Sequence, residues 1–299
     1  MRFTSKIAST LLALLTEKTG TSSTKARSLI KQGAVHVDGK AVFRPDLRVR
    51  PGQGVEIIEK KSRKAVKPPL FPVLYEDEFL IAAQKPAGLL SISTKTENRS
   101  TFYRAVSDYV KGGMPRVRGK IPGAKIFIIH RLDREVSGVM LFAKNQEIKK
   151  AIQDSWDKTE KIYNALVEGR PPKDEDTITG WLCESGESLV WSCPAPAPDS
   201  KSFAKYAVTH YKFITGNRRY SLLEVRIETG RKHQIRVHMK DIGCPVVGDK
   251  KYGATGKSPI ERMGLHAARL TFTHPVNGRK IVIVSPMPKS FMLPFKTAK

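Results

Sequence analysis

Apolar and polar positions near the N-terminus follow a helical period twice and then alternate. The first helical repeat consists of Ile7, Leu11, Leu14 and Leu15. The stretch TSSTKARSLIKQG predicts a second helix, with Ser22 or Ser23 as its N-cap and Gly33 just beyond its end. AVHVDGKAV alternates around Asp38-Gly39, which is typical of a tight hairpin, and PGQGVEII adds one more strand. Together these elements predict a small α/β domain.

A basic segment, KKSRKAVKPP, follows this domain. It has no apolar periodicity and it ends in two prolines, so we interpret residues 61–69 as a linker. We therefore expect one domain over residues 1–60 and a second, larger one over residues 70–299.

The rest of the chain alternates strand and helix patterns. FPVLYEDEFLIAAQK predicts two strands, KIYNALVEG one strand, and YAVTHYKFI with RYSLLEVRI a pair joined at Gly216-Asn217. ARLTFTHPVNGRKIVIV predicts a hairpin that turns at Asn277-Gly278. One helix is predicted over residues 145–157 and another over RKHQIRVHMKDIG, which ends at Gly243. The expected inward face of the first of these helices comprises Ile148, Ala151, Ile152 and Trp156. The polar residues 170–202 predict no element.

Charge narrows the choice of partner. The chain carries 53 Lys and Arg against 28 Asp and Glu, a formal net charge of +25. A field of this size attracts polyanions, so nucleic acid is the leading partner and an anionic membrane the competing one. No apolar run approaches the ~20 residues of a membrane-spanning helix. Helical spacing explains the apolar patch near the N-terminus better than a signal peptide does.

The cysteines suggest neither a zinc site nor a disulfide framework. Cys183, Cys193 and Cys244 are odd in number and lack the paired short spacings of zinc ligands. We interpret them as incidental thiols in a reducing compartment, and we expect a cytoplasmic protein.

Polar side chains gather in four stretches. HRLDREVSG, residues 130–138, follows the apolar run IFII, and charges at the end of a buried strand need a partner or a use. On this stretch alone, a polar loop with a local salt bridge fits slightly better than a functional site. KIYNALVEG places Tyr163 in mid-strand, and VVGDKKYG places Asp249 and Tyr252 in a glycine-bounded loop. ETGRKHQIRVHM carries Arg231, His233, Gln234, Arg236 and His238.

These stretches do not predict a metal or a nucleotide cofactor. His233 and His238 lie on different faces of a helix, and no glutamate completes a zinc-protease pattern. No glycine-rich phosphate loop is present in the sequence.

The N-terminal pattern, SSTKARSLIKQGAVHVDGK followed by RPDLRVRPGQGVEI, resembles an S4 RNA-binding domain over most of residues 1–60. The resemblance implies that the capped helix and the hairpin grip structured RNA through its backbone. Lys25, Arg27 and Lys31 are then expected to contact phosphates, with a merely solvated basic face as the alternative.

Six further motifs follow one another in a recognisable order. They are QKPAGLLS, HRLDREVSGVMLFAK, KIYNALVEG, AVTHY, ETGRKHQIRVHMKDIGCPVVGDKKYG and LHAARLTFTHP. In this order they resemble the RluA family of pseudouridine synthases. The resemblance implies an α+β domain whose mixed, largely antiparallel sheet, flanked by helices, holds a central cleft. It also implies a monomer that isomerises uridine to pseudouridine in RNA without a cofactor or a metal.

The resemblance assigns three catalytic residues. Asp133 matches the family's catalytic aspartate, Arg236 the arginine paired with it, and Tyr163 the tyrosine that packs on the flipped uracil. A guanidinium favours the ionised carboxylate, which burial alone would neutralise. The aspartate could attack the sugar, attack the base or remove a proton from the sugar. A turn-capping Asp, a phosphate-binding Arg and a core Tyr are the structural alternatives.

Other matching residues are expected to contact RNA. Arg131 falls where family members fill the gap left by the extruded base, although a plain phosphate contact fits nearly as well. His130 is expected to position rather than to catalyse, and Arg231 and Lys232 to contact RNA. Lys232 stands where the family usually has Thr or Ser, and this departure adds charge near the RNA and concerns the choice of target. Val136 stands where the family usually has Thr, and this departure concerns the rigidity of the loop. Residues expected to serve the scaffold, or to support the site residues from behind, are Lys85, Pro86, Gly138, Gln234, Gly248 and Asp249.

We therefore expect an RNA pseudouridine synthase. By family habit its substrate is large-subunit ribosomal RNA, with transfer RNA left open. A catalytically silent RNA-binding or ribosome assembly factor is one alternative, and a base-releasing glycosylase is another.

Overall fold

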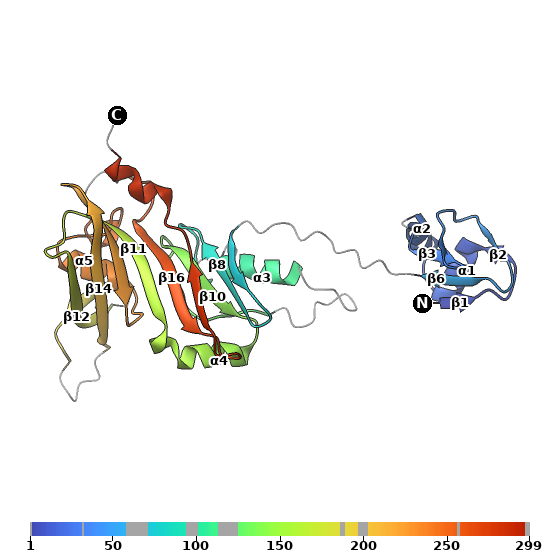
Figure 1. The fold of residues 1–299 in the computed structure, drawn as a ribbon, viewed down its shortest axis with the longest axis horizontal. Helices are drawn as coiled ribbons and strands as arrows, with labels where there is room; N and C mark the ends of the chain where they lie inside the picture. The colour runs from blue at the N-terminus through green and yellow to red at the C-terminus, as the bar shows by residue number, and fades with distance from the viewer. Residues whose placement is uncertain are drawn as a thin grey trace. The chain divides into compact units, whose positions relative to one another are not determined.

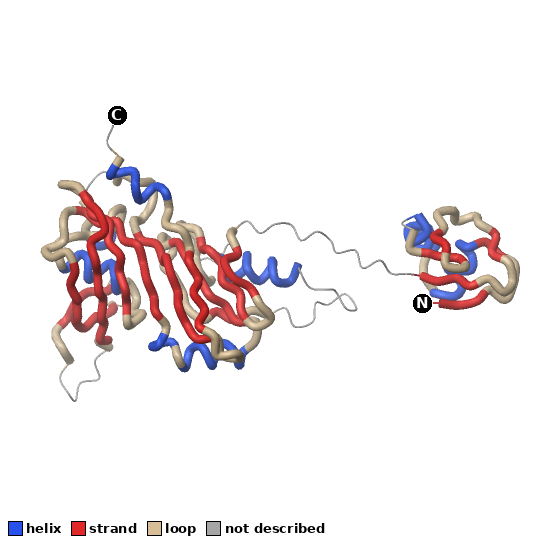
Figure 2. The backbone as a smooth tube through the Cα atoms, viewed as in Figure 1, coloured by secondary structure: helices blue, strands red, loops and turns tan. Residues whose placement is uncertain are grey.

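The computed structural model describes residues 2–31, 33–57, 71–93, 101–112, 125–185, 189–196, 203–255 and 258–296. The chain forms two units, residues 1–65 and 66–299, each with its own apolar core (Figures 1 and 2). The linker expected over residues 61–69 lies outside the described residues. None of the described helices is long and apolar enough to cross a membrane.

The smaller unit packs two short helices, α1 (Leu11–Thr19) and α2 (Ser23–Lys31), on short strands. Its sheet runs in the order β1 (Arg2–Thr4), β6 (Gly54–Ile57), β3 (Val35–Val37) and β4 (Lys40–Ala41). β2 (Ser9–Thr10) pairs separately with β5 (Arg48–Val49).

Local signals in the smaller unit are mostly confirmed. The Ser22 hydroxyl accepts a hydrogen bond from the Lys25 amide at 3.4 Å, and Gly33 has a φ of 65° where the chain leaves α2. Asp38 and Gly39 both adopt positive φ in the turn between β3 and β4, as a tight hairpin requires. The assignment of Ile7 to the first helix is wrong, because α1 begins at Leu11 and the Ile7 side chain is 58% exposed.

The larger unit is built on one mixed sheet. Its order is β13 (Val190–Cys193), β12 (Glu175–Glu184), β14 (Lys205–Gly216), β15 (Tyr220–Ile227), β11 (Glu160–Glu168), β16 (Leu265–Thr273), β10 (Ser137–Ala143), β8 (Leu80–Lys85) and β7 (Val73–Glu76). β17 (Lys280–Val284) pairs with β16, and β9 (Phe127–Ile128) pairs with β10. Between these strands, the parallel pairing in the described part is β10 with β16, so the sheet is mixed but largely antiparallel, as expected.

Helices flank this sheet. The α-helices are α3 (Phe102–Gly112), α4 (Gln146–Asp154) and α5 (Gln234–Asp241). Short 3-10 helices follow α4, α5 and β17, namely η1 (Trp156–Lys158), η2 (Lys250–Tyr252) and η3 (Lys289–Phe295). α4 packs against β9 and β10, whereas α5 packs against β13 and β14 (Figure 1).

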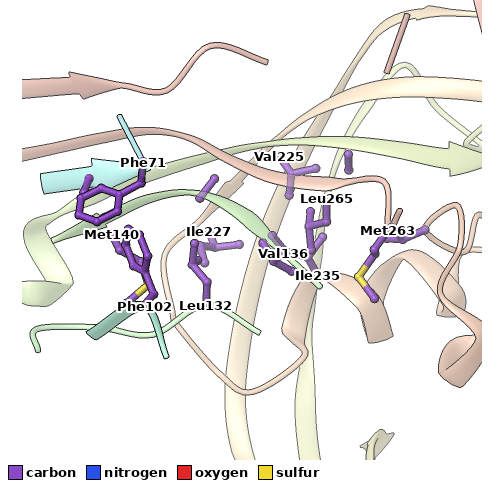
Figure 3. Packing of buried hydrophobic residues seen from close by; sticks show 14 of the residues in the cluster. Phe71, Phe102, Leu132, Val136, Met140, Val225, Ile227, Ile235, Met263 and Leu265 are labelled. Atoms are coloured by element: carbon purple, nitrogen blue, oxygen red, sulfur yellow. The ribbon is translucent and has the colours of Figure 1, made fainter. Parts of the chain in front are cut away.

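The main apolar core reaches the loop that follows β9. Leu132 and Val136 of this loop pack in one cluster with Ile235 of α5 and Leu265 of β16 (Figure 3). The loop and the start of α5 are therefore anchored in the same core, which fixes the side chains that lie between them.

Three expectations for the larger unit need correction. Residues 170–202, for which no element was predicted, contain β12 and β13 at the edge of the sheet. A disulfide joins Cys183 to Cys193, so the interpretation of all three cysteines as incidental thiols is wrong. The helix expected over residues 145–157 ends at Asp154, and Ala151, expected to face inward, is exposed. The amphipathic stripe of α4 is thus narrower than the sequence suggests.

Candidate active site

The loop over residues 130–136 is held rigidly at both ends. Lys85 is fully buried, and its Nζ donates hydrogen bonds to the carbonyls of Pro86 (2.9 Å), Leu89 (2.6 Å) and Arg134 (2.9 Å). Burial lowers the pKa of Lys85 to about 8. These hydrogen bonds connect the segment after β8 to the loop over residues 130–136 and so fix the position of the loop relative to the sheet.

A glycine sets the exit of the loop into β10. Gly138 has a φ of 120°, and a Cβ atom placed there would lie 2.2 Å from the Ala267 carbonyl oxygen of β16. Only glycine allows the two parallel strands to approach this closely. Val136 is buried in the core next to this point, where an apolar side chain replaces the hydroxyl expected from the family.

Gln234 fixes the start of α5. Its Nε2 donates to the Val208 carbonyl and to the Thr209 hydroxyl, both at 2.9 Å. Its Oε1 accepts from the Thr229 hydroxyl at 2.8 Å and from the Arg231 amide at 3.0 Å. The buried amide thus satisfies its hydrogen bonds while it attaches α5 to β14.

Asp133 and Arg236, far apart in sequence, form an ion pair between the loop and α5. Arg236 Nη1 donates to Asp133 Oδ2 at 2.8 Å. Its Nε and Nη2 bind both carboxylate oxygens of Asp249, at 2.6 and 2.9 Å. Burial lowers the Arg236 pKa, but the two carboxylates outweigh burial and raise it above its ordinary value. Asp133, whose side chain is 31% exposed, therefore always faces a charged guanidinium.

Tyr163 lies on β11, between Val225 of β15 and Ala267 of β16. Burial, and then the charge of Asp133, raise the Tyr163 pKa above its ordinary value, so the phenol stays protonated. Its hydroxyl has no hydrogen-bond partner among the described residues. The ring therefore offers an apolar face and one free donor.

A cavity of about 500 Å³ opens above these groups. Asp133, Tyr163 and Arg236 all line it, so the structure brings the three predicted catalytic residues together. This volume lies in the range of small-molecule binding sites and exceeds what a single nucleobase needs.

Four of the residues predicted to contact RNA also line the cavity, namely His130, Arg131, Arg231 and Lys232. His130 stacks on Trp156 with ring centroids 5.0 Å apart, and its Nε2 accepts a hydrogen bond from the Leu141 amide. Burial lowers the pKa of His130 to about 4, so it is neutral at physiological pH, which suits a positioning role.

Arg231 and Lys232 are exposed residues of the cavity lining, with partners on β14 and β12. Arg231 Nε donates to the Tyr206 carbonyl at 2.9 Å, and Lys232 pairs with Glu184. The other predicted RNA contacts, Lys25, Arg27 and Lys31, lie on α2 of the smaller unit with exposed side chains.

Two groups lie behind the ion pair. Asp249, expected to serve the scaffold or to support the site from behind, is 1% exposed and holds Arg236 with two hydrogen bonds. Tyr252 lies under Arg236, with the guanidinium 4.9 Å from its ring centre. The glycine-bounded loop VVGDKKYG drew attention to Asp249 and Tyr252 in the sequence. No feature of that stretch indicated that both residues pack behind α5. Among the described residues, no group of His, Cys, Asp and Glu side chains could hold a metal ion.

Sequence comparison relates the chain to one family. A model of that family, described as RNA pseudouridylate synthase, matches residues 80–241. An uncharacterised RNA pseudouridine synthase of Aquifex aeolicus is 33% identical over 290 residues, covering 89% of this chain and 85% of the relative. Ribosomal large subunit pseudouridine synthase D of Zymomonas mobilis is 30% identical, covering 95% of this chain and 92% of its own length. tRNA pseudouridine synthase C of Haemophilus ducreyi is 34% identical, covering 75% of this chain and 93% of its own length.

Solved structures agree on the fold. The human protein RNA Pseudouridylate Synthase Domain Containing 4 superposes with a TM-score of 0.58 at 22% identity, covering 75% of this chain and 91% of that one. The human protein RNA Pseudouridylate Synthase Domain Containing 1 superposes with a TM-score of 0.54 at 21% identity, covering 73% of this chain and 84% of that one.

Proposed function

This chain belongs to the RNA pseudouridylate synthase family and is an RNA pseudouridine synthase, an isomerase, and on that premise we propose that it modifies specific uridines of large-subunit ribosomal RNA. The base is detached from the ribose at N1, turned, and rejoined through C5. The observation that carries the site assignment is the Asp133–Arg236 ion pair facing Tyr163 across one cavity.

The reaction makes two demands on the enzyme. The uridine must leave the helical stack, because a stacked base cannot turn. The volume of about 500 Å³ leaves room for a nucleoside whose base rotates in place. The detached uracil must stay enclosed, since its loss or attack by water would destroy the nucleotide.

Asp133 is the catalytic carboxylate in this proposal. Arg236 donates a charge-assisted hydrogen bond to it, and Asp249 holds Arg236 in place from behind. An ionised carboxylate can attack the sugar or the base, or remove a proton from the sugar. Each of these steps needs one oxygen of Asp133 directed at the nucleotide.

Tyr163 and Arg131 hold the extruded nucleotide and its surroundings. The Tyr163 ring provides a stacking face for the uracil, a contact worth roughly 1–3 kcal/mol for a base on an aromatic side chain. Its protonated hydroxyl can donate to the base as negative charge develops there. Arg131, exposed at the cavity, fills the gap that the uridine leaves in the RNA.

The choice of ribosomal RNA rests on coverage. The relative named for the large ribosomal subunit covers 95% of this chain, which must include most of residues 1–65, whereas the relative named for tRNA covers 75%. In our proposal residues 1–60 act as an S4-like domain that binds structured RNA through Lys25, Arg27 and Lys31. The enzyme then works in the cytoplasm, as a monomer.

Release of tritium from C5 of uracil tests the proposal. Formation of the C5–C1′ bond expels the C5 hydrogen to water, so RNA labelled with tritium at C5 reports each turnover. We expect release from large-subunit ribosomal RNA of a strain lacking this gene, and none from RNA already modified by the enzyme. Asp133→Asn should abolish release and leave RNA affinity within about twofold of wild type, because the shape of the side chain is retained while its charge is lost.

Each other result points to a different function. Release from tRNA alone would move the substrate to that class. Free uracil in the reaction would indicate a glycosylase. Binding without release from either pool would indicate an RNA-binding or assembly factor.

A further inference from the structure

A chain of polar groups leads from β13 through Tyr252 and His233 to Asp133. The Val190 amide of β13 donates to the Tyr252 hydroxyl at 3.0 Å. The Tyr252 hydroxyl lies 2.7 Å from His233 Nδ1. The other ring nitrogen, Nε2, lies 3.7 Å from Asp133 Oδ2 and lines the cavity. The sequence singled out His233 in ETGRKHQIRVHM, but the proposed chemistry leaves it without a role.

The protonation state of this histidine follows from its surroundings. Burial lowers the pKa of His233 to about 4, even though the charge of Asp133 acts in the opposite direction. Arg236, Lys251 and Lys232 also face the ring and favour its neutral form. A neutral imidazole carries one proton, and its position decides what the ring can do.

The hydrogen-bond chain selects Nε2 as the protonated nitrogen. Because the Tyr252 oxygen already accepts from the Val190 amide, its hydroxyl proton is free to point at Nδ1. The alternative tautomer would aim a nitrogen lone pair at the Asp133 carboxylate, which is electrostatically unfavourable. His233 therefore presents an N–H to Asp133.

The backbone adds a second observation. His233 has a φ of 55°, and Asp38 in its hairpin turn is the other non-glycine residue with positive φ in the described chain. A left-handed conformation is costly for such a side chain and is found where the surroundings enforce it, often at functional sites. Here it turns the ring from the start of α5 towards the loop that carries Asp133.

Arg236 divides its hydrogen bonds unequally between two carboxylates. Asp249 takes two of its hydrogen bonds and Asp133 only one. Both Arg236 Nη1 and His233 Nε2 approach the same oxygen, Oδ2. Oδ1 accepts no hydrogen bond from the described residues, so it stays available to the nucleotide.

We infer that His233 is a positioning residue for Asp133. Its neutral Nε2–H closes on Oδ2 when RNA is bound, and together with Arg236 it holds the carboxylate with Oδ1 directed at the nucleotide. The distance of 3.7 Å is too long for a hydrogen bond in the free enzyme, and catalytic hydrogen bonds commonly shorten in the substrate complex. The inference rests on the proposed function of Asp133.

Three variants test it by single-turnover tritium release and filter binding. His233→Asn suits the left-handed backbone and can keep the contact to Tyr252, but it removes the donor at Nε2. His233→Gln restores an amide donor near that position. Tyr252→Phe keeps the ring under Arg236 and removes the hydroxyl that selects the tautomer. His238→Asn is the matched control, because His238 is a buried histidine of the same helix that bonds to Thr209 instead.

We expect His233→Asn to slow the chemical step about tenfold at unchanged RNA affinity, as the loss of one hydrogen bond to a charged group implies. His233→Gln should recover most of the lost rate, and Tyr252→Phe should show a smaller loss. His238→Asn should lower the melting temperature without slowing the chemical step. A wild-type rate for His233→Asn, or no recovery of rate in His233→Gln, would overturn the inference.

A second measurement separates this inference from the proposed function. Long-range nitrogen–proton NMR spectra of histidine-labelled enzyme resolve a small set of rings, since the chain has 7 histidines. The His233 signals, assigned by their loss in His233→Asn, should show Nε2–H and should shift in Asp133→Asn. If wild-type enzyme released no tritium, the proposed function would fail, yet these spectra would still decide whether His233 donates towards Asp133. A ring protonated at Nδ1, or one that does not respond to Asp133→Asn, would refute the inference.

Discussion

Arg236 joins two carboxylates that have different environments. Asp249 is buried and takes the bidentate side of the guanidinium, whereas Asp133 is partly exposed and takes a single hydrogen bond. This geometry needs a planar, always charged group with several donors in fixed directions. Lysine has a single charged atom and cannot satisfy both carboxylates with the same spacing.

Arg236→Lys should therefore lower both the rate of catalysis and the stability of the fold. We expect single-turnover tritium release to fall about 100-fold or more, because Asp133 loses a fixed charged donor. We also expect about 3–5 kcal/mol of lost stability, because Asp249 stays buried without its bidentate partner. Urea unfolding followed by tryptophan fluorescence measures the second effect.

Arg226→Lys, at a surface ion pair with Glu228, is the matched control and should change neither value appreciably. Near-normal turnover by Arg236→Lys would contradict this account of the ion pair.

Single residues were predictable where a local motif carried them. Asp133, Tyr163 and Arg236 were predicted from their motifs, and the structure brings them to one cavity. The chain from Val190 through Tyr252 to His233 was not predictable, because it depends on three segments that meet only in the folded protein. Hydrogen bonds between distant segments have no sequence signature of their own.

The hairpin of β12 and β13 shows where element prediction failed. It lies at the edge of the sheet, where much of each strand is exposed and the alternation of apolar residues is weak. A signal was nevertheless present, in the repeat of Trp-x-Cys at residues 181–183 and 191–193. In the antiparallel register Trp181 pairs with Cys193 and Cys183 pairs with Trp191, which brings the two cysteines onto one face.

This hairpin also supports the site. Its inner face packs Leu182 and Val190 against Val237 of α5 and against Tyr252. The disulfide Cys183–Cys193 closes the hairpin on the other face, with a sequence separation of 10. Such cross-links are uncommon in reducing compartments, so the disulfide argues against the cytoplasmic location proposed above.

Replacement of both cysteines by serine should loosen this hairpin locally. We expect the Val190 amide to lose about 2–3 kcal/mol of protection against hydrogen exchange, the stabilisation typical of a cross-link closing a short loop. Dithiothreitol should have the same effect on the wild-type protein and none on the Cys183→Ser, Cys193→Ser double variant. Titration should find one thiol in the unfolded, unreduced protein, Cys244, and three after reduction. Three thiols before reduction would show that the disulfide does not form.

For the whole molecule, composition predicted the class of partner, and the sequence pattern predicted the fold. A net charge of +25 pointed to a polyanionic partner before any motif was considered, and an RNA-modifying family agrees with it. The mixed sheet was predicted from alternating patterns and from the family resemblance, and it is confirmed. The helices and strands of the smaller unit were largely predicted too, because caps and tight turns depend on neighbouring residues. The charge of the smaller unit and its resemblance to an S4 domain predict that it binds RNA.

Salt dependence of RNA binding tests this prediction. Each phosphate contact contributes about 0.7–0.9 to the slope of log affinity against log salt concentration. Lys25→Ala, Arg27→Ala and Lys31→Ala together should therefore reduce the slope by about 2–3, and deletion of residues 1–65 should reduce it further. The three side chains are exposed on α2 and alanine favours helix, so the fold should survive the triple variant.

At saturating RNA the triple variant and the deletion variant should release tritium at the wild-type rate, because the larger unit holds the whole cavity. An unchanged slope in the deletion variant would mean that the smaller unit does not bind phosphates, and the basic groups of the larger unit would then account for RNA affinity.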